Sequence, residues 1–164
     1  MAVEVAVPAE RAWAAVADWE SQRAWMVATR VRGVAAAAGG AASGTARGPA
    51  SDASPAEVAS AASGVGGRIE GWTGIGPVGF LDTMTITEWD PPHRCVVLHT
   101  GRVVRGTGGF EVAPRSGGCR VTWWERVELP FGVVGRAGWL VLGPVTRAFF
   151  VLSLRRLKRL LEAS

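Results

Sequence analysis

Two acidic residues interrupt alternating apolar runs and are the residues best placed to do chemistry. Glu125 shares its place in the alternation with Trp123 and Val127, and Asp82 shares its own with Met84. Because alternate residues of a strand lie on one face, both carboxylates are expected to point to the inside of a sheet. There, a carboxylate could orient a ligand hydroxyl or act as a general acid or base. The alternative is a structural ion pair with an arginine on a neighbouring strand.

Large apolar side chains are expected to form the rest of the site. The sequence holds eight tryptophans and no tyrosine, so one frequent proton donor is missing. Rings with few polar atoms suit an apolar pocket, although ordinary core packing would also account for each of them. The residues expected to bind a ligand are Trp72, Met84, Phe110, Trp123, Glu125 and Trp139.

Motifs for cofactors, metals or nucleophiles are not matched. The segment 74–79 (GIGPVG) has the letters of a dinucleotide-binding loop, but a strand rather than a helix is expected after it, which indicates a hairpin. His93 is expected to be solvated beside a diproline turn. His99 is expected to be an ordinary strand residue unless its parity turns it inward. We therefore expect no metal and no cofactor.

Length and cysteine content indicate one domain whose core needs no disulfide bond or metal for stability. A chain of 164 residues can bury a sizeable core. Cys95 and Cys119 match neither a zinc spacing nor a disulfide framework, so reduced core thiols in a cytosolic protein are expected. No signal peptide is indicated, and Arg136, Pro144 and Arg147 interrupt the apolar run 133–154, which argues against a membrane span.

The basic residues bear on possible partners. The net charge is +4, and all but one of the 18 basic residues are arginine. A group of them near the end of the chain is expected to form a solvated helix face, with contact to an anionic membrane surface or a protein as the alternative. Nucleic acid is not an expected partner, because no recognition helix or stacking motif accompanies the charge. This group comprises Arg147, Arg155, Arg156, Lys158 and Arg159.

The hydrophobic pattern predicts an α+β fold with a seven-stranded antiparallel sheet. Two short helices are expected after the first strand, at 8–17 and 19–25. Between Ala35 and Gly64 alanine, glycine and serine dominate, which predicts a low-complexity loop insertion, with a capping box at 54–57 that could start a short helix. The predicted strands are 2–7, 26–34, 68–73, 80–89, 95–100, 103–112 and 119–129.

A long amphipathic helix is predicted at the end of the chain, and the sheet must curve to cover it. Pro144 would either kink this helix or begin a separate one. The residues expected opposite its apolar stripe are Arg155, Arg156, Lys158, Arg159 and Glu162. The stripe is formed by Phe149, Phe150, Ser153, Leu154, Leu157, Leu160 and Leu161.

The order of these elements resembles the START-like helix-grip superfamily, in its SRPBCC or polyketide cyclase/dehydrase-like branch. The resemblance covers the chain apart from 35–64, and no catalytic residue set carries over with it. It implies a cavity between a curved sheet and the last helix, used for lipids, sterols, polyketides, quinones or hormones. A carrier of a small hydrophobic ligand is the first hypothesis, and a cyclase or aromatase using Glu125 or Asp82 is the second. The resemblance rests on VAVPAERAW (5–13), DWE (18–20) with Trp25, TEWDPPHR (87–94), Gly106 with GFEV (109–112), TW (122–123) and LRRLKRLL (154–161).

Overall fold

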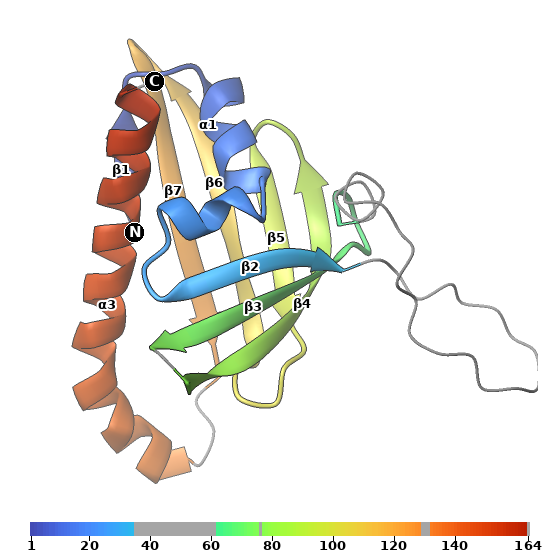
Figure 1. Cartoon of the computed structure of the whole chain (residues 1–164), viewed down its shortest axis with the longest axis vertical. Coiled ribbons are helices and arrows are strands. Elements are labelled where there is room, and N and C mark those ends of the chain that lie inside the picture. Colours follow the sequence, from blue (N-terminus) through green and yellow to red (C-terminus); the bar gives the residue numbers. More distant parts are fainter. Residues whose placement is uncertain (35–61, 76, 129–131, 164) are drawn as a thin grey trace, which may run out of the picture.

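The computed structural model describes residues 1–34, 62–75, 77–128 and 132–163, with the backbone alone described for 75 and 132–142. One strand and two short helical segments are followed by six strands and a long final helix (Figure 1). The elements are β1 (Ala2–Val5), α1 (Ala9–Ala17), the 3₁₀ turn η1 (Ser21–Ala24), β2 (Thr29–Val34), β3 (Arg68–Ile75), β4 (Val78–Asp90), β5 (Arg94–His99), β6 (Gly106–Arg115), β7 (Gly118–Val127) and α3 (Gly132–Glu162).

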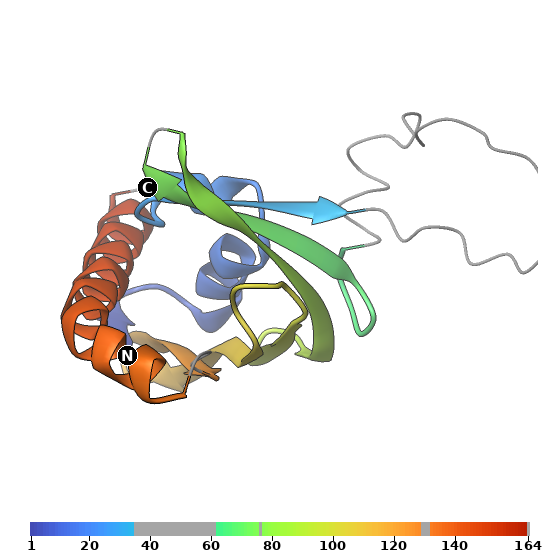
Figure 2. The same cartoon turned by 90° about the horizontal axis from the view of Figure 1, so that it is seen from below.

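The strands form a single antiparallel sheet in the order β1-β7-β6-β5-β4-β3-β2. Each strand from β2 to β6 pairs with the next one along the chain, and β1 pairs with β7. The sheet is strongly curved, and α3 runs along its open side between the β1 edge and the β2–β3 edge (Figure 2). The predicted α+β fold, with seven curved antiparallel strands around a C-terminal helix, is confirmed.

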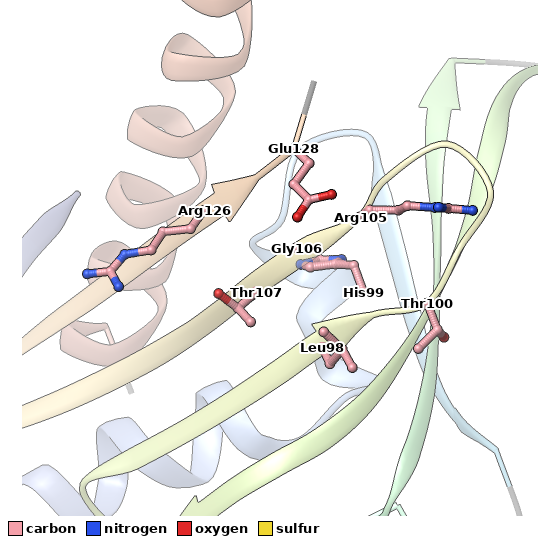
Figure 3. A pocket seen from close by; sticks show the side chains of 8 residues that line it. All are labelled: Leu98, His99, Thr100, Arg105, Gly106, Thr107, Arg126 and Glu128. Carbon is pink, nitrogen blue, oxygen red and sulfur yellow. The ribbon is translucent and has the colours of Figure 1, made fainter. Parts of the chain in front are cut away.

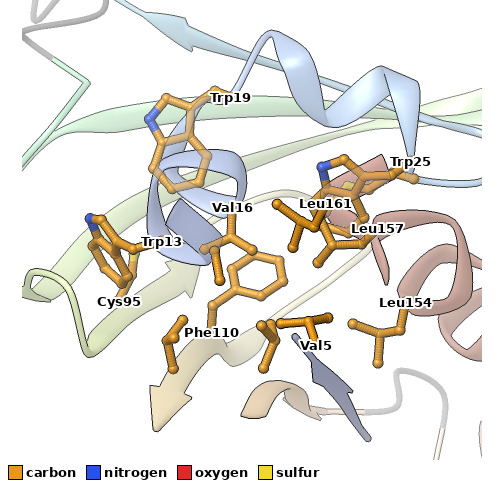
Figure 4. Close-up of a cluster of buried hydrophobic side chains, with 14 of the residues drawn as sticks. Val5, Trp13, Val16, Trp19, Trp25, Cys95, Phe110, Leu154, Leu157 and Leu161 are labelled. Atoms are coloured by element: carbon orange, nitrogen blue, oxygen red, sulfur yellow. The ribbon is translucent and has the colours of Figure 1, made fainter. Parts of the chain in front are cut away.

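The core lies inside this curve and is built by the apolar faces of α1, α3 and the sheet (Figure 4). Pro8 precedes α1, whose buried residues Ala12, Trp13 and Val16 recur at helical spacing. Trp13 packs edge-on against Trp89 of β4, with ring centroids 5.2 Å apart. The short N-terminal helices therefore cover one end of the inner face of the sheet.

The last helix is continuous through Pro144, so the proline lies inside one helix and does not separate two. Leu154, Leu157 and Leu161 are buried as expected. Leu160 was expected in the same stripe but is 40% exposed. It precedes Leu161 by one residue, which is about 100° around the helix, and this carries it to the margin of the stripe.

Hydrogen bonds fix α3 at both edges of the sheet. Ser153 Oγ accepts a hydrogen bond of 2.9 Å from the backbone N–H of Val27, which precedes β2. Near the other end of the helix, Glu162 Oε1 accepts one of 3.0 Å from the backbone N–H of Ala6, just after β1. The helix is therefore attached to the sheet near both of its edge strands, β1 and β2.

Several boundaries differ from the predicted ones. The second helix is only one 3₁₀ turn, and β2 starts at Thr29 because the preceding backbone turns at Ala28, which has a φ of 56°. Most of the predicted 35–64 insertion, including its capping box, falls outside the described residues.

Cys95 and Cys119 are free and buried. Within the described parts of the chain, no helix is both long and apolar enough to cross a membrane.

Candidate functional site

Strand pairing brings two acids and a histidine together on the inner face of the sheet. Asp82 lies on β4, His99 on β5 and Glu125 on β7. Asp82 Oδ2 is 2.6 Å from His99 Nδ1, and Glu125 Oε2 is 2.9 Å from His99 Nε2. We call these three residues the inner cluster. It joins the two acids predicted from sequence through a histidine that was not predicted to take part.

The geometry of the inner cluster favours a doubly protonated imidazole between two carboxylates. Each ring nitrogen of His99 faces a carboxylate oxygen, which accepts hydrogen bonds, so both nitrogens donate. The imidazole is only 6% exposed. Burial by itself lowers the pKa of His99, but the hydrogen bonds to Asp82 and Glu125 and the charges of these acids outweigh it and raise the pKa to about 9. His99 is therefore a buried cation at neutral pH.

A glycine allows Glu125 to reach His99. The two residues are on β7 and β5, and β6 runs between them. Gly108 of β6 pairs directly with Glu125, and a Cβ atom at this position would collide with Oε2 of that carboxylate. With no side chain in the way, the carboxylate crosses over β6 to the imidazole.

Replacement of Gly108 with alanine is expected to separate Glu125 from His99 and to destabilise the fold by about 2 kcal/mol, the usual scale of overpacking. The pKa of His99 should fall toward its ordinary value, because one of its two carboxylate partners is displaced. Urea unfolding and an NMR titration of the imidazole would measure the two effects.

Gly71→Ala is the matched control, because Gly71 also lies on the inner face and its added Cβ would meet the flexible end of Met84 at 3.3 Å and a methyl group of Val31 at 3.9 Å, without a collision. An unchanged His99 titration in the Gly108 variant would contradict this role of the glycine.

An aromatic wall adjoins the inner cluster. The Trp123 indole Nε1–H donates a 3.0 Å hydrogen bond to Glu125 Oε1. The Trp123 ring packs against Phe150 of α3, with centroids 4.0 Å apart, and against Phe110 at 5.3 Å. Trp25, which is 1% exposed, stands edge-on to Phe110 and Trp123 behind them. One carboxylate thus links the charged cluster to an apolar surface shared by sheet and helix.

The residues predicted to bind a ligand fall into three groups. Met84, Phe110, Trp123 and Glu125 share the inner face of the sheet, as does the predicted acid Asp82. Trp72 pairs with Leu81 on the opposite, outer face, where its ring lies against Gly74 and Gly79, so we leave it out of the site. Trp139 belongs to α3, in the part whose side chains are not described.

His99, Gly108 and Phe150 were missed as site residues. His99 has the parity of the buried residues Cys95 and Val97, and this alternation was the available signal. The match of Gly108 to Glu125 depends on strand register, which no local pattern reveals. Among the residues that the structure describes, no group of histidine, cysteine and acidic side chains could hold a metal ion.

An open depression of about 530 Å³ lies around the ends of β5, β6 and β7 (Figure 3). Leu98 and Arg126 flank it from the outer face of the sheet, since both pair with Thr107. His99 is the one lining residue that belongs to the inner cluster. We place the candidate site at the inner cluster, because this depression combines opposite charges on exposed side chains and has no aromatic wall. Its lining residues are Leu98, His99, Thr100, Arg105, Gly106, Thr107, Arg126 and Glu128.

Comparisons with known proteins agree with this architecture. A family model described as polyketide cyclase/dehydrase and lipid transport matches residues 1–162. The solved structure of TTHA0849 from Thermus thermophilus has a TM-score of 0.68 at 15% identity, covering 99% of this chain and 95% of that one. Ms6760 from Mycobacterium smegmatis has a TM-score of 0.59 at 19% identity, covering 99% and 88%. At such identities the likeness shows the fold alone. Comparison with curated protein sequences found no match.

Proposed function

Because the chain belongs to the polyketide cyclase/dehydrase and lipid transport family, we propose that it binds a small hydrophobic molecule on the inner face of its curved sheet. The ligand would lie between the sheet and α3, against Met84, Trp123 and Phe150. The inner cluster would hold the polar end of the ligand.

One observation carries this proposal: three large apolar side chains, two on the inner face of the sheet and one on α3, are only partly buried. Trp123 and Met84 of the sheet and Phe150 of α3 keep part of their surface accessible, whereas Ile86, Phe110 and Val121 of the inner face are buried. Apolar surface that remains accessible beside a few convergent polar groups is the usual character of a ligand site. The accessible part of the inner face adjoins the inner cluster, which supports a ligand position there.

Replacement of Trp123 with alanine is expected to weaken binding of a hydrophobic probe at least about tenfold, because the ring supplies most of the apolar wall. Native mass spectrometry and calorimetry with fatty alcohols, sterols, quinones and aromatic polyketides would first find a probe that binds. The affinity for that probe would then be compared between variants.

Trp124→Ala is the matched control, because Trp124 is the next residue of β7 and lies on the outer face, under the guanidinium groups of Arg94 and Arg126. An equal loss of affinity in both variants would contradict the proposed position. Failure of every probe class to bind would remove the proposal.

Acid–base catalysis is the second candidate, favoured by the polar character of the inner cluster. Glu125 keeps 22% of its side chain exposed, and the buried His99 orients it through a direct hydrogen bond. This arrangement would suit a cyclase-type or aromatase-type reaction in which Glu125 carries a proton. Glu125→Gln would then abolish turnover of a polyketide substrate and spare binding of an apolar probe, while unchanged turnover would exclude this role.

A further inference from the structure

The hydrogen-bonding state of the inner cluster bears on the class of ligand, and the inference rests on the proposed function. We propose that the site selects hydrophobic molecules whose polar end donates a hydrogen bond, such as a phenol, an alcohol or an amine, and discriminates against carboxylates. Three features of the described residues carry this proposal.

The first feature is that every donor in the inner cluster is already in use. The two ring N–H groups of His99 donate to Asp82 and Glu125, and the indole N–H of the adjoining Trp123 donates to Glu125. The carboxylate oxygens can still accept, because each has more than one lone pair. Asp82 Oδ1 is buried and has no hydrogen-bond partner at all within the described structure. The cluster can therefore accept a hydrogen bond from a ligand, but it has no N–H group left to donate. The indole N–H of Trp25 in the adjoining wall has no partner, but it is itself buried.

The second feature is the sign of the charge. Two carboxylates and one imidazolium leave one negative charge in excess. The described strands place their arginines on the outer face of the sheet, where Arg32 pairs with Glu70, Arg94 with Glu88 and Glu111, and Arg120 with Glu4. Strand register assigns Arg30, Arg68, Arg115 and Arg126 to the same outer face. A ligand carboxylate at the cluster would meet a like charge with no cation from these strands to balance it.

The third feature is the position of the accessible acceptor. Asp82 and His99 have side chains that are 11% and 6% exposed, whereas the Glu125 side chain is 22% exposed. The ring of Trp123 is bonded to the same carboxylate and continues the wall to Phe150. A ligand body lying on this wall would bring a polar end to Glu125. An aromatic probe with one polar substituent reproduces that arrangement.

Four probes of matched shape would test the preference: 4-hexylphenol, 4-butylbenzylamine, 4-hexylbenzoate and hexylbenzene. Calorimetry at pH 7 on the full chain is expected to give affinities at least about tenfold tighter for the phenol and the amine than for the benzoate. Hexylbenzene, with no polar group, should fall between them. The Glu125→Gln variant should reduce the phenol-to-benzoate ratio at least about fivefold, because the amide has less charge and offers a donor.

Glu111→Gln serves as control, because Glu111 is on the outer face of the sheet and pairs with Arg94. The phenol-to-benzoate affinity ratio of this variant should equal that of the unchanged chain. Benzoate binding as tight as phenol binding would overturn the selectivity and leave the proposed function standing. A phenol-to-benzoate affinity ratio that Glu125→Gln does not alter would also overturn the selectivity and leave the proposed function standing. Failure of all four probes would overturn both. If the Glu125 variant does not fold, the ratio measured on the unchanged chain still decides the proposal.

Discussion

Replacement of His99 with leucine is expected to lower the free energy of unfolding by about 4 kcal/mol, the scale observed when one partner of a buried ion pair is removed. The imidazole bonds to both Asp82 and Glu125, so its loss leaves two carboxylates on the inner face with no positive charge between them. Urea unfolding at pH 7, followed by tryptophan fluorescence, would measure the change.

His93→Leu is the matched control, because His93 is exposed beside the turn between β4 and β5 and should change stability by less than about 0.5 kcal/mol. Adding Asp82→Asn and Glu125→Gln to the leucine variant should recover part of the loss, since the uncompensated charges are then gone. A leucine variant as stable as the unchanged chain would show that the inner cluster contributes nothing to folding.

Stability is also expected to fall by about 3 kcal/mol as the pH rises from 6.5 to 9. The pKa of His99 is about 9 in the folded state against 6.5 as its ordinary value, so the folded state binds the proton more tightly than the unfolded chain does. This contribution is fully present below pH 6.5 and is lost as the pH rises through 9. Unfolding free energies measured in urea at several pH values would reveal the slope.

The free energy of unfolding of the His99→Leu variant should not show this decrease between pH 6.5 and 9, whereas that of the His93→Leu variant should show it. The measurement should stop near pH 9, because burial raises the pKa of the Cys95 thiol to about 12 and that of Cys119 above its ordinary value. Ionisation of these thiols in the unfolded chain would add a second loss at higher pH. A flat profile between pH 6.5 and 9 would mean that His99 is not held as a cation.

Alternation along single strands was sufficient to predict which faces most residues occupy. In β4 and β7 the apolar residues recur at every second position, and Asp82 and Glu125 were correctly placed on the inner face for that reason. In β3 the pattern is ambiguous, because Ile69 and Trp72 have opposite parity. Trp72 was expected at the ligand because of its large apolar ring, yet it lies on the outer face.

The partners of the two acids depend on register between strands, and local sequence does not encode it. The register of the β4–β5 pairing shifts by one residue between Ile86 and Glu88. Counting back from the turn between the two strands therefore gives the wrong partner for Met84, which pairs with His99. The crossing of Glu125 over Gly108 needs β6 between β5 and β7. The helix stripe was predicted more closely than these contacts, because its period lies within one element.

The most direct test of ligand binding on the inner face uses the tryptophan indole N–H signals in two-dimensional ¹H–¹⁵N NMR spectra. Tryptophan-to-phenylalanine variants would assign the signals of Trp123 and Trp124, and 4-hexylphenol would then be titrated in. We predict a saturable shift of the Trp123 signal, because its N–H bonds to Glu125 beside the proposed ligand, and no shift for Trp124 on the outer face. A shift of Trp124 with an unchanged Trp123 signal would contradict binding on the inner face.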